Sequence, residues 1–288
     1  MTFNMADYVP PAPKLQEQDL KGKVAVVTGA SKGIGRSIAL SLATRGCSIL
    51  GTYSSPESAH FFDTLTHTVQ RLYATPQDAP KMRGVVADIT SLPSVGAILT
   101  TLTEHFRGQK LSILVFNASF NTRPRLGAAS EHDISSSLTG NLHWPIVLME
   151  NLVRQSMFTD NSRVIVISSD RVRDPSPGSG LFNATRAAME SLVRSWAIEL
   201  PHNFPGTTVN AVSVGLTDTP GLRSFPPAAV EALKEQRLKK VKVVEGGRIG
   251  YAEDIADVVD WLVGAKSRWI TGSVVAANGG AEWVGGSS

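Results

Sequence analysis

A chain of 288 residues, with 42% hydrophobic side chains and a net charge of +3, has the size of a single globular α/β domain. Its lysines and arginines are scattered instead of clustered, which disfavours a nucleic-acid partner and favours small anionic ligands. It contains no apolar run of the roughly 18 residues that a membrane span needs, no hydrophobic signal core and a single cysteine, Cys47. We therefore expect a cytoplasmic protein without a membrane partner.

The predicted elements alternate along the chain. The first residues are rich in proline and lack hydrophobic periodicity, so we expect an extended arm over residues 1–20 and one folded domain over residues 21–288. Short apolar runs rich in β-branched residues predict buried parallel strands at Val24–Thr28, Ser48–Tyr53, Met82–Ala87, Leu111–Phe116, Arg163–Ser168, Thr207–Val212 and Ile270–Ala277. Amphipathic segments between them predict helices, among them Ile34–Arg45, Leu92–Phe106, Ile134–Met157, Leu181–Leu200 and Ala252–Val263.

This alternation of strand and helix is typical of one fold class. It predicts an α/β protein with a single Rossmann-like, doubly wound fold, in which helices flank a seven-stranded parallel sheet. Ligands of such folds bind at the carboxyl ends of the strands. The long connection over residues 217–247 follows the sixth strand, so we expect it to form a substrate lid with a short helix in its SFPPAAVEALKEQ portion.

The segment KGKVAVVTGASKGIGRSIAL joins the first predicted strand to the first predicted helix through a glycine-rich loop. Glycines at this point let the backbone approach a pyrophosphate, and the helix N-terminus offers free N–H groups and the positive end of its dipole. The loop that we expect to hold a dinucleotide consists of Gly29, Ser31, Lys32, Gly33, Ile34 and Gly35.

The spacing Thr-Gly-x-x-x-Gly-x-Gly from Thr28 to Gly35 resembles the short-chain dehydrogenase/reductase family, and the resemblance continues almost to the C-terminus. It implies that Asp88 in VVADIT contacts the adenine and that its neighbour Ile89 also binds the cofactor. The run Asn117-Ala118-Ser119 stands where the family usually has Asn-Ala-Gly, and the segment with Gly215, Thr217 and Thr219 looks like the one that touches the nicotinamide amide. The resemblance therefore implies a nicotinamide cofactor bound along the whole strand edge.

The end of the second predicted strand indicates which cofactor is bound. An NAD enzyme usually places an acid there to bind the ribose 2′-hydroxyl, but the segment GTYSSPES has no acid directly after the strand. Tyr53, Ser54 and Ser55 can hydrogen-bond a 2′-phosphate instead, and Lys32 and Arg36 can pair with its charge. We therefore predict NADP(H).

The catalytic end departs from the family pattern. The resemblance implies that Asn141 in TGNLHWP positions a water relay and that Ser169, which ends RVIVISS, polarises the substrate. The family's proton-donating Tyr aligns with Phe182, and its Lys aligns with Arg186. Phe182 has no ionisable proton, while Arg186 can hydrogen-bond the ribose but stays protonated at ordinary pH. The usual reaction between alcohol and ketone is therefore disfavoured.

Several functions stay open. Hydride transfer to an iminium ion needs no proton in the same step, and Asp170 or Asp174 in SSDRVRDPSPG can stabilise its positive charge, unless Asp170 forms a salt bridge with Arg171 or Arg173. A redox-neutral cyclisation or isomerisation over bound NADP(H) needs positioning more than proton transfer. A non-enzymatic NADP-binding protein and a carbonyl reductase with another proton donor are the remaining alternatives.

A second resemblance bears on the choice. Fungal alkaloid pathways contain short-chain-dehydrogenase-like proteins that combine iminium reduction with control of a Diels–Alder cyclisation. This chain is similar to them in its altered tetrad and in the Pro-x-Pro-Gly of Pro175–Gly178. The resemblance implies a reductase, a Diels–Alderase or both in secondary metabolite biosynthesis.

Two long predicted helices and two arginines indicate possible binding partners. The long helices over 134–157 and 181–200 correspond to helices that pack subunits together in the family, which implies a homodimer or homotetramer. Arg123 and Arg125 follow the fourth predicted strand, where they either bind an anion or form a solvated face. We expect no metal site.

Overall fold

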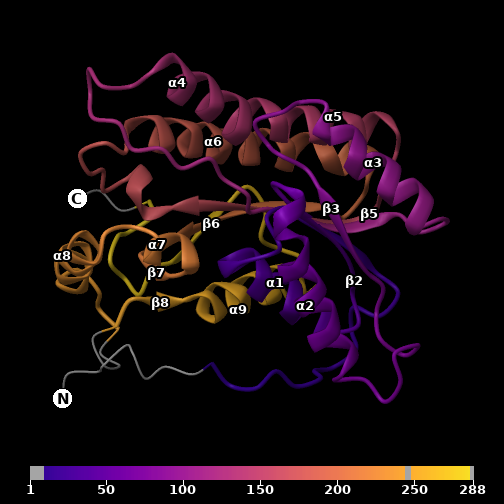
Figure 1. Ribbon diagram of the computed structural model, residues 1–288. Helices are drawn as coiled ribbons and strands as arrows, with labels where there is room; N and C mark the ends of the chain where they lie inside the picture. Colours follow the sequence, from indigo (N-terminus) through magenta and orange to yellow (C-terminus); the bar gives the residue numbers. More distant parts are fainter. Residues whose placement is uncertain (1–9, 244–247, 286–288) are drawn as a thin grey trace.

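The computed structural model describes residues 10–243 and 248–285, so part of the expected arm and the end of the expected lid lie outside the described residues. Seven parallel strands form one sheet in the order β3-β2-β1-β4-β5-β6-β9 (Figure 1). The predicted fold class is confirmed. The strands are β1 Val24–Val27, β2 Ser48–Tyr53, β3 Met82–Val86, β4 Leu111–Phe116, β5 Phe158–Ser169, β6 Thr208–Val214 and β9 Val274–Ala277.

Helices cover both faces of the sheet (Figure 1). One face carries α1 Gly33–Thr44, α2 Ala59–Gln70 and α9 Ala252–Val263, and the other carries α3 Ser94–His105, α4 Glu131–Leu138, α5 Trp144–Arg154 and α6 Gly180–Asn203. Each face has its own hydrophobic core, and the four residues of β1 alternate between the two cores. Strands that are buried on both sides explain the continuous apolar runs in the sequence.

The order of strands reverses at β1, which pairs with β2 on one side and β4 on the other. In a doubly wound sheet the loops on the two sides of such a reversal turn to opposite faces, and a crevice opens between them at the carboxyl ends of the strands. The loops after β1, β2, β4, β5 and β6 therefore converge on one edge of the sheet.

The predicted helix over 134–157 is wrong as a single element. A π-helical turn over Thr139–His143 separates α4 from α5. Pro145 lies in the first turn of α5 and has no N–H, so it cannot give the α-helical hydrogen bond to the carbonyl of Asn141. The amide of Trp144, directly before Pro145, donates to the carbonyl of Thr139 five residues back, which is the wider π-helical bond, and Asn141 lies inside this turn.

The boundaries of three strands differ from the prediction by more than one residue. β5 begins at Phe158, because its first residue already pairs with Leu111 of β4. β6 continues to Val214. The last strand begins at Val274 instead of Ile270, after a turn in which Gly272 has a φ of +67°.

The connection after β6 forms its own small layer beside the strand edge (Figure 1). It contains β7 Thr217–Asp218, which pairs with β8 Gly250–Tyr251, and the helices α7 Pro220–Arg223 and α8 Pro227–Leu238. The expected helix in SFPPAAVEALKEQ is present as α8. No helix among the described residues is long and apolar enough to cross a membrane.

Candidate active site

A cavity of about 870 Å³ opens at the carboxyl ends of β1, β2, β4, β5 and β6. Its walls come from the glycine loop, the loops after β4 and β5, the first turns of α6, and the α7–α8 segment. It therefore occupies the crevice that the strand order predicts.

The glycine loop is held in place by hydrogen bonds from β4. The side chain of Asn117 donates to the carbonyls of Thr28 (2.9 Å) and Gly29 (3.2 Å), and the Thr28 hydroxyl accepts from the amides of Asn117 (2.9 Å) and Ala118 (3.0 Å). A side chain at Gly35 would collide with the Gly29 carbonyl and the Asn117 amide. Gly35 thus permits close packing of helix on strand, while the residues over 31–34 line the cavity.

The start of α1 suits an anion. The helix begins at Gly33, no side chain caps its N-terminus and no acid lies in its first turn, so its free N–H groups keep their positive potential. Gly29 and Gly33 have φ values of +68° and +54°, which a residue with a side chain rarely adopts. The described residues therefore fit a dinucleotide pyrophosphate at this point.

The end of β2 agrees with the prediction in part. Tyr53 and Ser54 line the cavity, whereas Ser55 does not. The ammonium of Lys32 lies 4.0 Å from the centre of the Phe61 ring and remains at the cavity wall. The expected pairing of Arg36 with a 2′-phosphate is corrected, because its guanidinium donates to the carbonyl of Phe61 at 2.7 Å and does not line the cavity.

The remaining predicted cofactor residues lie around the cavity in chain order. Asp88 accepts hydrogen bonds from the amide and hydroxyl of Thr90, both at 2.9 Å, which fixes its carboxylate at the wall. The other lining residues of this group are Ile89, Asn117, Ala118, Ser119, Gly215, Thr217 and Thr219.

Asn141 is buried and does not line the cavity. Its side-chain oxygen accepts from the amide of Phe120 and its side-chain nitrogen donates to the carbonyl of Phe120, both at 2.8 Å. Both polar atoms of the Asn141 side chain therefore bond to the loop after β4. Asn141 acts on the cavity only by positioning that loop.

Phe182 and Arg186 lie on the first two turns of α6 and both line the cavity. Arg186 is 3% exposed and donates to the carbonyls of Ile167 (3.1 Å) and Ala118 (3.3 Å). Burial lowers the pKa of Arg186 to about 10, and no carboxylate among the described residues forms an ion pair with it. A guanidinium has five N–H groups, so donors remain for hydroxyls of a bound ligand.

Asp170 follows Ser169 at the end of β5, and both line the cavity. Asp170 is 3% exposed, and its Oδ2 atom has no hydrogen-bond partner among the described residues. Burial raises the pKa of Asp170, against the opposing effect of the Arg237 and Arg171 charges. The Ser169 hydroxyl accepts from the amide of Arg171 at 3.3 Å.

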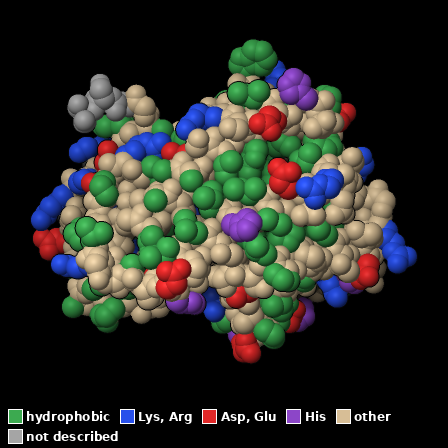
Figure 2. Space-filling view, turned by 90° about the horizontal axis from the view of Figure 1, so that it is seen from above, with side chains coloured by type: hydrophobic (Ala, Val, Ile, Leu, Met, Phe, Trp, Pro, Cys, Tyr) green, Lys and Arg blue, Asp and Glu red, His purple; other side chains and the backbone are tan. Residues whose placement is uncertain are grey.

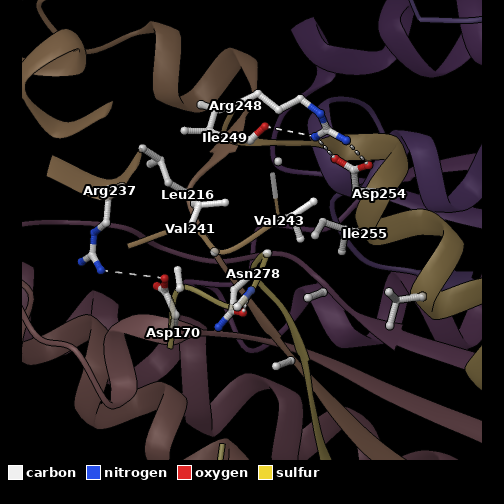
Figure 3. A pocket seen from close by; sticks show the side chains of 18 residues that line it. Asp170, Leu216, Arg237, Val241, Val243, Arg248, Ile249, Asp254, Ile255 and Asn278 are labelled. Atoms are coloured by element: carbon white, nitrogen blue, oxygen red, sulfur yellow. Dashed lines mark hydrogen bonds and ion pairs between the residues drawn. The ribbon is translucent and has the colours of Figure 1, made fainter. Parts of the chain in front are cut away.

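The salt bridge expected from Asp170 to Arg171 or Arg173 is wrong. Arg173 instead pairs with Glu190 at 2.6 Å, and Arg171 donates to the hydroxyl of Ser176 at 3.2 Å. The cation nearest to Asp170 is Arg237 of α8, with its Nη1 atom 3.8 Å from Oδ2 (Figure 3). No motif or spacing in the sequence marked Arg237, because the conformation of the segment after β6 decides where it points.

A second cavity, of about 380 Å³, lies on the other side of Asp170 and Arg237. Figure 3 shows these two side chains facing each other at its edge, with Leu216, Val241 and Val243 nearby. Asp170 lines both cavities, and its Oδ2 atom is itself buried between them, with Arg237 as its ion-pair partner.

Comparisons with known proteins agree with this geometry. A family model described as enoyl-(acyl carrier protein) reductase matches residues 29–282. The 3-oxoacyl-[acyl-carrier-protein] reductase FabG of Pseudomonas aeruginosa is 33% identical over 91% of this chain and 98% of its own length. The short-chain dehydrogenase/reductase FrzI of a Cladobotryum species is 30% identical over 91% of this chain and 96% of its own length. A short chain dehydrogenase from Burkholderia cenocepacia, solved in complex with NADP, is similar with a TM-score of 0.76 and 27% identity, covering 91% of this chain and 99% of that one.

Proposed function

Because the chain belongs to the short-chain dehydrogenase/reductase family, we propose that it is an NADP(H)-dependent reductase whose acceptor is an iminium ion. The observation that carries this proposal is the pair Phe182 and Asp170. Phe182 offers no proton at the cavity wall, and Asp170 is a buried carboxylate there whose Oδ2 atom accepts no hydrogen bond from the described residues and has only the 3.8 Å ion pair with Arg237. A cyclic iminium of the kind formed in alkaloid biosynthesis is the substrate class.

NADP(H) is the cofactor of the proposed reaction. The Burkholderia cenocepacia neighbour is an NADP complex, and the residues of this chain fit the same ligand. The N-terminus of α1 would hold the pyrophosphate, Lys32, Tyr53 and Ser54 the 2′-phosphate, and Arg186 the ribose beside the nicotinamide. When bound there, NADPH supplies a hydride at the end of the cavity next to Ser169.

The proton balance favours an iminium over a ketone. A ketone that accepts a hydride becomes an alkoxide and needs a proton, whereas an iminium carbon that accepts a hydride leaves a neutral amine and needs none. Phe182 cannot supply a proton, and Arg186 is a poor donor even with its lowered pKa of about 10. Asp170 is placed to balance the positive charge of the substrate, and such pairing would relieve the cost of burying its carboxylate.

The test compares two bicyclic acceptors of similar size. We expect the protein to oxidise NADPH with N-methyl-3,4-dihydroisoquinolinium about a hundredfold faster than with 1-tetralone, because only the ketone needs a proton donor. Asp170→Asn should lower kcat/KM for the iminium at least about tenfold by removing the opposite charge. Asp160→Asn, at an exposed position on β5, is the control.

Equal turnover of the ketone would contradict the proposal and indicate a working proton donor, for which Asp170 with its raised pKa is the candidate. Tight NADPH binding without consumption in either reaction would instead favour a redox-neutral cyclase or a non-enzymatic NADP-binding protein.

The aromatic walls of the cavity support a second activity, a stereocontrolled cyclisation of the Diels–Alder type. The rings of Phe120, Phe182 and Phe225 line the cavity. Such walls can hold a flexible substrate in one folded conformation, which is the main requirement of a pericyclic step. A product ratio that is unchanged when the protein is added to a spontaneously cyclising diene would reject this activity.

We also propose that the protein forms a homodimer or homotetramer and is located in the cytoplasm. Figure 2 shows hydrophobic side chains spread over the face that α4, α5 and α6 cover. Leu138 of α4 and Ile198 of α6 are 47% and 70% exposed. Exposed apolar residues on long helices are typical of subunit interfaces. Light scattering that gave the mass of a monomer would reject this part.

A further inference from the structure

Arg123, Arg171 and Arg237 line the part of the cavity at α8 together with Asp170, and Asp174 pairs with Arg237 outside the cavity lining. The carboxylate of Asp174 forms ion pairs with Arg237 and, at 2.8 Å, with Lys240. The Nη2 atom of Arg237 also donates to the backbone carbonyl of Asp174 at 3.3 Å. Asp170 has Arg237 as its nearest cation. The ion pairs of both carboxylates are therefore made by residues of α8 and the turn after it. Arg123 and Arg171 form no ion pair with either of these carboxylates.

Arg171 is buried, and no carboxylate within residues 10–243 and 248–285 forms an ion pair with it. Its one side-chain hydrogen bond among the described residues goes to the neutral hydroxyl of Ser176. Burial and the charges of Arg123 and Arg237 together lower the pKa of Arg171 to about 10, against the smaller opposing effect of Asp170 and Asp174. A buried cation that neighbouring cations repel is costly unless an anion joins it.

Arg123 is the second such charge. Its guanidinium lies 5.0 Å from the centre of the Phe225 ring, and its Nε atom donates weakly to Asn121 at 3.4 Å. No carboxylate among the described residues forms an ion pair with it, and burial and the charge of Arg237 lower its pKa. Both arginines line the large cavity.

The Pro-Ser-Pro-Gly turn over 175–178 brings the two arginines together. Gly178 has a φ of +82°, and a side chain there would lie 2.7 Å from the carbonyl oxygen of Arg123. Glycine thus permits the loop after β4 to pack directly on the loop after β5. Ser176, in the same turn, accepts the hydrogen bond that orients Arg171.

We propose that Arg123 and Arg171 form a subsite that binds a carboxylate group of the substrate. The inference rests on the proposed function, because it assumes that the substrate binds in this part of the cavity. The cofactor phosphates would not pair with these two arginines, because the glycine loop and the end of β2 would hold the phosphates at the opposite end of the cavity. Guanidinium groups bind carboxylates through paired hydrogen bonds. Phe120, Phe182 and Phe225 line the same region, so the carboxylate belongs to an aromatic or otherwise apolar molecule.

Calorimetric titration of the NADP⁺-saturated protein tests the subsite without any turnover. We expect 3-phenylpropanoate to bind at least about tenfold more tightly than its neutral amide, because two guanidinium groups favour the anion. Arg171→Gln and Arg123→Gln should each weaken binding of the acid at least about tenfold and leave binding of the amide within about twofold. Arg125→Gln is the matched control, because Arg125 lies in the same loop but is exposed and does not line the cavity.

Several results would overturn the subsite. Equal affinity for acid and amide, no binding of the acid, or an equal loss in Arg125→Gln would each remove its basis. Tighter binding of phenyl phosphate than of 3-phenylpropanoate would assign the arginines to a phosphate ester instead. NADPH affinity of each variant shows whether it is folded, and Arg123→Gln, at the less buried position, keeps the test open if Arg171→Gln is unstable.

The two experiments test the proposed reductase activity and the carboxylate subsite independently of each other. Binding of the carboxylate without iminium turnover would leave the subsite in place and reject the reductase proposal. Iminium turnover with no preference for the acid would do the reverse.

Discussion

The two ends of the large cavity differ in how their polar groups are paired. At the cofactor end, Thr28 and Asn117 hydrogen-bond each other's backbone and side chains, and Asp88 is bonded to Thr90. At the substrate end, Asp170 has only the 3.8 Å ion pair with Arg237 and no hydrogen bond to its Oδ2 atom, and no described carboxylate forms an ion pair with Arg171 or Arg123.

The difference indicates what each end does. Paired groups give the cofactor end a fixed shape before any ligand arrives, which suits a ligand common to a whole family. Unpaired buried charges destabilise the free protein, and they are expected where a specific ligand supplies the missing partner. Substitutions at the first end should therefore cost cofactor affinity, whereas substitutions at the second should change substrate choice and can even raise stability.

The largest effect is expected at the cofactor end. Gly35→Ala should weaken NADPH binding at least about a hundredfold or prevent folding, because the new methyl group would collide with the backbone of Gly29 and with Asn117. NADPH titration by fluorescence measures the loss. Gly96→Ala, on α3 with open space around the new methyl group, should bind normally and melt slightly higher.

The position of the glycine loop at the cavity could be predicted from the sequence because its geometry is local. One strand, one loop and one helix turn contain the residues from Gly29 to Ile34 that line the cavity. The substrate end is assembled from loops far apart in the chain, so the partner of Asp170 turned out to be Arg237, and Arg36 turned away to Phe61. Such pairings depend on loop conformation, which neither periodicity nor motif spacing determines.

The π-helical turn illustrates the same limit within one segment. Hydrophobic periodicity runs through residues 134–157, so it predicts one helix. Pro145 interrupts the hydrogen bonds without interrupting the apolar pattern. Pro145 was visible in the sequence, but only the structure shows that the chain widens into a π-turn instead of kinking or ending.

The second largest effect concerns the missing proton donor. Phe182→Tyr combined with Arg186→Lys should raise NADPH-dependent reduction of 1-tetralone at least about tenfold, because the pair restores a phenol beside a cation that can lower its pKa. Phe182→Tyr alone should change it less than about threefold, since Arg186 is already bonded to the carbonyls of Ile167 and Ala118. A large gain from the single substitution would mean that Arg186 activates a phenol as well as lysine does.

A smaller effect is expected where Lys32 meets the cofactor. Lys32→Glu should weaken NADPH binding about tenfold and NADH binding much less, because only NADPH carries the 2′-phosphate. Lys110→Glu makes the same change of charge at an exposed position just before β4. Equal losses for the two cofactors would remove the phosphate contact from Lys32.

The smallest effect is a gain in stability at the substrate end. Asp170→Asn should raise the free energy of unfolding at neutral pH by about 1 kcal/mol, the usual size of a stabilising change at a functional site. The raised pKa of Asp170 means that the folded protein holds this proton more tightly than the unfolded chain does. The contribution of Asp170 to stability is therefore present in acid and is lost as the pH rises through its folded pKa, so the advantage of the variant should grow with pH. Urea unfolding at several pH values measures this trend.

The opposite sign is expected for a carboxylate whose partners are already in place. Hydrogen bonds from Ser130 and Thr122 lower the pKa of Asp133 to about 2. Its ionised form therefore stabilises the folded protein above the ordinary carboxyl pKa, and that stability is lost only as the pH falls toward 2. Asp133→Asn should consequently lower stability at neutral pH. If both variants lost stability there, the carboxylate of Asp170 would have to be paired in the free protein, and the contrast between the two ends of the cavity would not hold.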